Sequence, residues 1–121
     1  MKFANKLCMV AALGLIGVAP AMADCAYPKK PSDPPNGAQA TQQEMVAAMR
    51  ATKQFDADVK TYQTCLDSET QEMIAALGDK ATAEEIERVK EKQVTKQNTA
   101  YEDATKVAEA FNVQLRAFKS R

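Results

Sequence analysis

The sequence predicts an all-α fold: an antiparallel hairpin of two long helices, with a proline-rich N-terminal strap, the arm, held by a disulfide. Apolar or small residues recur every three or four positions through residues 41–77 and 82–118, which is the spacing of one face of a helix. Only about four residues connect the two stretches, so the helices must lie antiparallel. We therefore expect a helical hairpin domain over residues 41–121, packed in the manner of a coiled coil.

Residues 1–23 have the pattern of an export signal. Lys2 and Lys6 form a short positive region, and an apolar run follows from Leu7 to Ala19. Ala21-Met22-Ala23 then supplies the small residues that signal peptidase requires. The style of the segment is bacterial, which indicates the periplasm.

A retained membrane anchor and a lipoprotein are the alternatives to a cleaved signal. The apolar run is about 13 residues long, whereas a membrane-spanning helix needs about 20. Cys25 follows closely, but Asp24 occupies the position where a lipobox needs Gly or Ala. We expect cleavage before Asp24 and a secreted, periplasmic protein without stable membrane insertion.

The charge balance argues against a nucleic-acid partner. Lys2 and Lys6 leave with the signal, so 14 basic residues remain against 16 acidic ones. A nucleic-acid-binding domain is typically strongly basic. The remaining chain of roughly 98 residues is one small domain, and such domains usually need a covalent cross-link.

Cys25 and Cys65 supply that cross-link, because Cys8 lies in the signal and a single pair is left. The pair lacks the C-x-x-C spacing that redox-active and metal-binding cysteines favour. We expect a structural disulfide, which the chain-entropy model values at about 4 kcal/mol for a loop of about 40 residues.

Residues 24–40 are expected to form an extended arm. Four prolines exclude a helix there and favour polyproline II, and Asn36-Gly37 marks a turn. A disordered linker and a proline-rich partner motif are the alternatives. However, the arm can reach roughly 50 Å and Cys65 lies roughly 36 Å along the first helix, so the arm is long enough to lie along that helix.

Both helices have the same start signal. Thr41-Gln42-Gln43-Glu44 and Thr82-Ala83-Glu84-Glu85 are capping boxes, and Gly78 marks the end of the first helix. A second cap at Ser68 would break the first helix, but we expect that helix to be continuous.

Facing positions in such a hairpin have residue numbers that sum to about 160. The expected pairs are Ile74 with Ile86, Val59 with Tyr101, Met49 with Phe111, and Met45 with Leu115. Both ends should therefore be well packed, whereas the middle, around Gln93, Gln97 and Asn98, is polar. The arm would bring Tyr27 to this middle, near Tyr62 and Tyr101, with hydroxyl groups reaching Gln97 or solvent.

The sequence offers little chemistry for catalysis, and we expect no enzyme, no cofactor and no metal. It contains no histidine, which excludes every Ser-His and Cys-His triad. Neighbouring carboxylates such as Asp56 and Asp58 do not converge on one point of a helix. Met45 and Met49 lack a third soft ligand for Cu(I), so core packing is expected of them.

Six residues are candidate interaction residues: Tyr27, Tyr62, Tyr101, Arg116, Lys119 and Arg121. The three cations either contact phosphates of anionic lipid or complement the dipole at the end of the second helix. We call the line of contact between the two helices the seam. Val94, Ala110 and Val113 lie off this seam, and a second apolar strip made by them would pair hairpins into a homo-oligomer with a four-helix core.

Three motifs resemble those of small, helical exported proteins of gammaproteobacteria with one disulfide. The motifs are Cys25-Ala-Tyr-Pro, Gly37-x-x-Ala-Thr and Phe111-Asn-x-Gln-Leu-Arg. The resemblance covers most of the mature chain and implies no activity. The hairpin shape is also similar to that of periplasmic chaperones and stress adaptors.

These observations favour a non-catalytic periplasmic interaction protein that binds protein partners through a helical face, as a chaperone or an adaptor does. The alternative is an inhibitor or immunity-type protein that binds one envelope enzyme. A broad, apolar and adaptable groove would favour the first function, and a compact charged patch would favour the second.

The export signal makes a direct prediction. N-terminal sequencing of the protein purified from its host should begin at Asp24, because signal peptidase cleaves after Ala23. A chain that still begins at Met1 and sediments with the membrane fraction would contradict this assignment.

Overall fold

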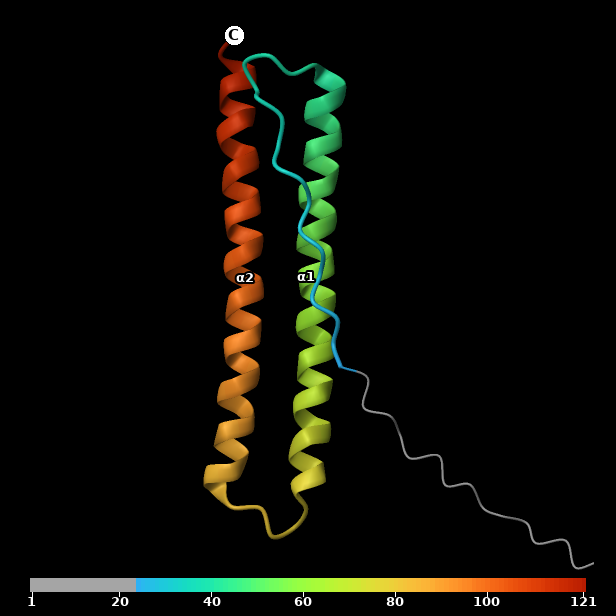
Figure 1. The fold of residues 1–121 in the computed structure, drawn as a ribbon, viewed down its shortest axis with the longest axis vertical. Coiled ribbons are helices and arrows are strands. Elements are labelled where there is room, and N and C mark those ends of the chain that lie inside the picture. The colour runs from blue at the N-terminus through green and yellow to red at the C-terminus, as the bar shows by residue number, and fades with distance from the viewer. Residues whose placement is uncertain (1–23) are drawn as a thin grey trace, which may run out of the picture.

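The computed structural model describes residues 24–121, so the predicted signal and its cleavage site lie outside the described residues. Helix α1 spans Gln42–Leu77 and helix α2 spans Ala83–Lys119. They form the predicted antiparallel hairpin, and the arm runs extended along it from mid-height to one end (Figure 1). We call the end with residues 40–49 and 111–121 the terminal end, and the end with residues 70–92 the loop end.

Both capping boxes are present. The Thr41 hydroxyl accepts a hydrogen bond from the Glu44 N–H at 3.2 Å, while the Glu44 carboxylate accepts one from the Thr41 N–H at 2.7 Å. Thr82 and Glu85 repeat this arrangement at the start of α2. Gly78 ends α1 with a φ of 77°, a conformation that a side chain would oppose. The first helix is continuous through Ser68, as predicted.

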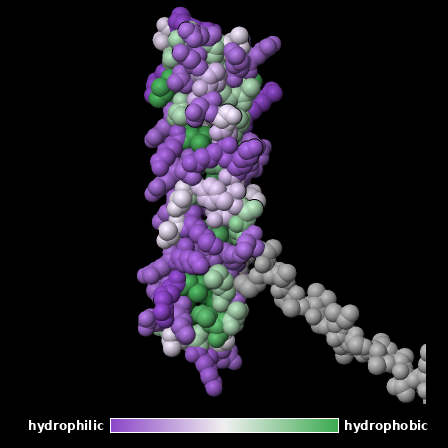
Figure 2. All heavy atoms as spheres, viewed as in Figure 1, coloured by the Kyte–Doolittle hydropathy of each residue, from purple (hydrophilic) through white to green (hydrophobic). Residues whose placement is uncertain are grey.

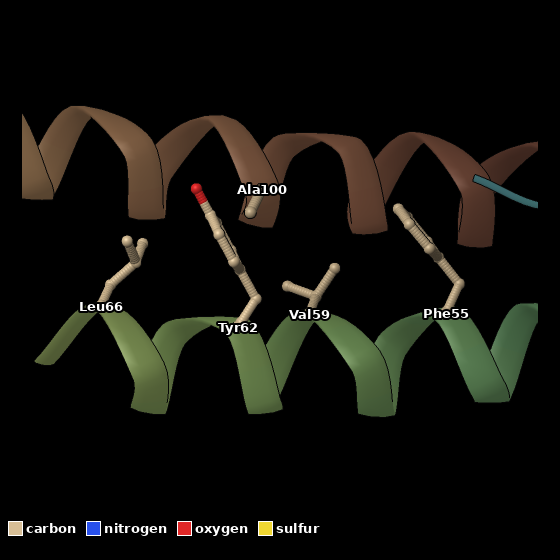
Figure 3. Packing of buried hydrophobic residues seen from close by; sticks show 5 residues of the cluster. All are labelled: Phe55, Val59, Tyr62, Leu66 and Ala100. Atoms are coloured by element: carbon tan, nitrogen blue, oxygen red, sulfur yellow. The ribbon is translucent and has the colours of Figure 1, made fainter. Parts of the chain in front are cut away.

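Two clusters of buried hydrophobic residues lie between the helices. The middle cluster consists of Phe55, Val59, Tyr62, Leu66 and Ala100. Its four α1 members point toward α2, and Ala100 points back from α2 (Figure 3). The terminal cluster consists of Ala40, Met45 and Phe111, with Met49 and Leu115 packed against it. This second cluster confirms the pairing predicted for the terminal end.

The predicted inward position of Tyr101 is wrong. Ala100 is the α2 residue that is fully buried beside Val59 and Tyr62, whereas Tyr101 is 66% exposed. The reason is geometric, since one residue along a helix turns a side chain by about 100°. A small side chain at Ala100 also leaves room for the larger residues of α1.

The expectation that both ends are well packed fails at the loop end. Beyond Leu66 on α1 and before Ala100 on α2, the only buried residues are Glu69 and Gln93. The apolar residues of the loop end, Met73, Ile74, Ile86 and Val89, are partly exposed, and Leu77 is 38% exposed. Two helices alone leave their seam open along both sides, and the arm does not extend this far.

The arm is anchored at the terminal end by a close backbone contact. The Gly37 N–H donates a hydrogen bond to Gln114 Oε1 at 2.9 Å. A Cβ atom at Gly37 would lie 1.9 Å from the Gln114 carbonyl oxygen, so only glycine fits there. The turn predicted at Asn36-Gly37 is present, because the Asn36 carbonyl accepts hydrogen bonds from the Gln39 and Ala40 N–H groups.

Gly37→Ala should therefore destabilise the protein by about 1–3 kcal/mol, because the added methyl group forces the arm away from α2. Ala38→Gly is the matched control, since Ala38 is exposed in the same turn. Urea denaturation followed by circular dichroism measures both variants. Equal midpoints for Gly37→Ala and the unmodified protein would show that the arm does not pack as described.

Candidate interaction site

The predicted disulfide joins the arm to the middle of α1. Cys25 and Cys65 are bonded, with their Cα atoms 5.8 Å apart. Cys25 also packs against the middle cluster, while Cys65 is exposed on the flank of α1. The bond therefore fixes the start of the arm beside the seam.

Asp103 on α2 holds two residues of the arm. Its carboxylate accepts a hydrogen bond from the Tyr27 hydroxyl at 2.6 Å and pairs with Lys30 Nζ at 2.8 Å. These interactions, that of Lys30 first, lower the pKa of Asp103 below its ordinary value. Burial, together with the hydrogen bond to Asp103, raises the pKa of Tyr27 to about 12. The arm thus bridges both helices, covalently to α1 and through Asp103 to α2.

The tyrosines predicted to gather at mid-height do so only in part. Tyr27 and Tyr62 make an edge-to-face contact, with ring centroids 5.2 Å apart. Tyr101 instead borders a groove on which no arm residue lies, together with Val59, Ala104 and Ala108. The Tyr27 hydroxyl meets Asp103, and Gln97 bonds to Asp67.

A polar layer crosses the seam just below the arm. Gln93 is buried and donates a hydrogen bond to Glu69 at 2.7 Å, and Lys96 also reaches Glu69 at 3.3 Å. On the other flank, Gln97 donates to Asp67 at 2.7 Å. The hydrogen bond from Gln93 is the main reason that the pKa of Glu69 lies below its ordinary value. These contacts fix the register of the helices, because a shift of one turn would leave Glu69 buried without its donor.

The loop end presents an apolar strip with no covering segment among the described residues. Its members are Met73, Ile74, Leu77, Ile86 and Val89. Figure 2 shows hydrophobic surface at this end, among hydrophilic residues and beyond the start of the arm. Helical spacing places Glu72 on the flank of α1 that also carries Cys65, and places Lys92 on the flank of α2 that carries Asp103. The strip is thus bordered by opposite charges.

Of the three C-terminal cations, one has a structural role. Arg121 donates a hydrogen bond to the Ala40 carbonyl at 2.6 Å and lies 4.1 Å from the centre of the Phe118 ring. Arg116 and Lys119 are exposed in the last turns of α2. Of the residues named for self-association, Val94 and Val113 are each about half exposed, and Ala110 is exposed beside the cavity under the arm. Self-association through these residues stays a prediction.

No protein-family model, curated protein or solved structure matches this chain. The resemblance noted for the cysteine motif therefore stays a prediction. Within residues 24–121, no helix is long and apolar enough to cross a membrane, and no group of three acidic or cysteine side chains is placed to hold a metal.

Several residues of the site were not predicted, although the sequence contains a signal for two of them, Glu69 and Lys30. Glu69 interrupts the apolar pattern of α1, and its number and that of Gln93 sum to nearly 160, which indicates that the two residues face each other. Lys30 is a cation on an arm expected to lie along the hairpin, and an acidic partner such as Asp103 fits that position. The contact of Gly37 with Gln114 had no signal, because it depends on how closely the arm approaches α2.

The depressed pKa of Glu69 makes stability depend on pH. Its carboxylate stabilises the fold at neutral pH, and that contribution is lost as pH falls below 4.5 and through the lower folded pKa. Glu69→Gln should cost about 1–2 kcal/mol at neutral pH and show a smaller loss on acidification. Glu72→Gln, on the same flank but exposed, is the control. Identical pH profiles for Glu69→Gln and the unmodified protein would exclude this role.

Tyr27 should titrate well above the ordinary pKa of a tyrosine. Because its folded pKa is about 12, stability is retained below pH 10 and lost as pH rises from 10 to 12. In Asp103→Asn the pKa of Tyr27 should move toward 10, whereas in the exposed control Glu102→Gln it should not. Tyrosinate absorbance measures this titration. A Tyr27 that titrates normally in the unmodified protein would contradict the contact with Asp103.

Proposed function

We propose that this chain is a non-catalytic, exported interaction protein, an adaptor or chaperone-like module, that binds a helical segment of a partner protein at the loop end. The partner helix lies against the apolar strip of Met73, Ile74, Leu77, Ile86 and Val89 and completes a three-helix bundle. Export is supported by the Cys25–Cys65 disulfide, which is typical of an oxidising compartment.

One observation carries the proposal: the seam between the helices is covered by the arm along only part of its length. Where the arm lies over it, Phe55, Val59 and Tyr62 are each less than a tenth exposed. Beyond the polar layer of Glu69 and Gln93, where the arm is absent, the apolar residues of the seam are partly exposed. The loop end therefore lacks the third element that the rest of the hairpin has.

The chemistry of the strip favours an adaptable binder over an inhibitor of one enzyme. Met73 is unbranched and flexible, so it fits side chains of different shapes. The charges at its borders have both signs, with Glu72 on α1 and Arg88 and Lys92 on α2. A compact patch of one sign, which the inhibitor function would favour, does not border the strip.

Site-specific photocrosslinking in intact cells tests the proposal. A benzophenone amino acid at Leu77 or Ile86 should give a discrete adduct whose partner peptide, identified by mass spectrometry, is an amphipathic helix. Val113, which is 51% exposed near the other end of α2, is the matched apolar control and should give no such adduct.

A charge substitution in the strip provides a second test of the binding site. Ile86→Glu should abolish crosslinking from Leu77 because a buried carboxylate at the contact costs free energy. Lys106→Glu, outside the loop end, should leave the adduct unchanged. The same adducts from Val113 and Leu77, or none from the loop end in cells that express the protein, would overturn the proposal.

A further inference from the structure

The arm consists of two parts that are held very differently. At the terminal end, Gly37 and Ala40 are buried, and Arg121 and Gln114 bond to their backbone. Residues 24–36, by contrast, contain no buried residue. No backbone N–H group of residues 24–36 donates a hydrogen bond within the described chain. This outer part depends on a few side-chain contacts and on the disulfide.

The polar contacts of the outer part converge on one carboxylate, and its four prolines are only partly buried. Tyr27 and Lys30 both bind Asp103, and the Tyr27 ring contacts Tyr62. Tyr27 is itself 44% exposed, and Lys30 is also exposed. Pairs between partly exposed groups contribute little free energy. Without the covalent bond, such contacts are too few to offset the entropy of ordering about a dozen residues.

We propose that the Cys25–Cys65 disulfide is a redox-controlled fastening: its reduction releases residues 24–36 from the hairpin, while the helices and the anchored residues 37–40 stay in place. The fold allows this, because α1 is continuous past Cys65 and each helix keeps its own capping box. The inference goes beyond the proposed binding at the loop end and does not depend on it.

The reductant in this proposal is a dithiol. One thiolate of the dithiol attacks the sulfur of Cys65, the more exposed of the two cysteines, and forms a mixed disulfide. The bond to Cys25 breaks, and the Cys25 thiolate takes a proton. The second sulfur of the dithiol, as a thiolate, then attacks the dithiol sulfur of the mixed disulfide, and Cys65 leaves as a thiolate that takes a proton. Two electrons thus pass to the protein, and the dithiol becomes a disulfide.

Release would change the surface between mid-height and the terminal end. A cavity of about 190 Å³ lies between the arm and the helices, bordered by Pro31, Ala48, Thr52, Val107 and Ala110. Without the outer arm this cavity becomes an open groove, and Tyr62 loses the ring that covers it. The uncovered part of the seam would then extend from the loop end toward the terminal end.

Limited proteolysis with trypsin tests the release, comparing the oxidised protein with the protein kept in excess dithiothreitol. The bond after Lys29 lies in the outer arm, and reduction should speed its cleavage at least about tenfold. The bond after Lys80, in the exposed connection between the helices, is the internal control and should be cut at the same rate in both states. Cys25→Ser with Cys65→Ser should show the fast rate with or without reductant.

Two further measurements separate release from other effects. The nuclear Overhauser contact between Tyr27 and Tyr62 should disappear on reduction, while far-ultraviolet circular dichroism keeps its helical signal. Unchanged cleavage after Lys29 and a retained contact would show that the arm stays docked without the bond. A large loss of helix would show that the disulfide supports the whole fold. Either result overturns the proposal, and neither bears on crosslinking at the loop end of the oxidised protein.

Discussion

Two helices packed side by side leave the seam between them open to solvent on both sides. The structure therefore depends on the arm, which covers one of these sides. Along the middle and the terminal end, the arm lies over one side of the seam, and Phe55, Val59 and Leu66 are buried there. The disulfide places the arm, because it joins Cys25 to the helix at the point where covering begins. A chain of this size has too little apolar surface to position such a segment by packing alone.

The polar layer marks the boundary between the two parts of the hairpin. Glu69 and Gln93 are buried together, so their bond replaces apolar packing where the arm stops. Gln93 Oε1 is buried without a hydrogen-bond partner among the described residues, which costs stability. The layer thus contributes register more than stability, and it separates a closed core from the open apolar strip at the loop end.

The features that the sequence predicted correctly are those set by local pattern. Capping boxes, the apolar spacing, the glycine stop and the only available cysteine pair gave the two helices, the hairpin and the disulfide. The errors concern side chains whose position depends on tertiary geometry. Tyr101 lies one residue beyond the seam, and Ile74 and Ile86 stay partly exposed because the arm ends above them. The role of Asp103 required knowing on which flank of α2 the arm lies.

The two attachments of the arm, at Cys25 and at Gly37, also set the minimum number of residues between them. Twelve residue steps separate Cys25 from Gly37, and in polyproline II they reach roughly 37 Å. Gln114, which receives Gly37, faces the level of residue 46 on α1, about 29 Å along the axis from Cys65. Substitutions at exposed arm positions leave this span intact, whereas loss of four residues would leave a reach of roughly 25 Å in polyproline II, too short for both attachments. The arm is therefore free to vary in composition but constrained in length.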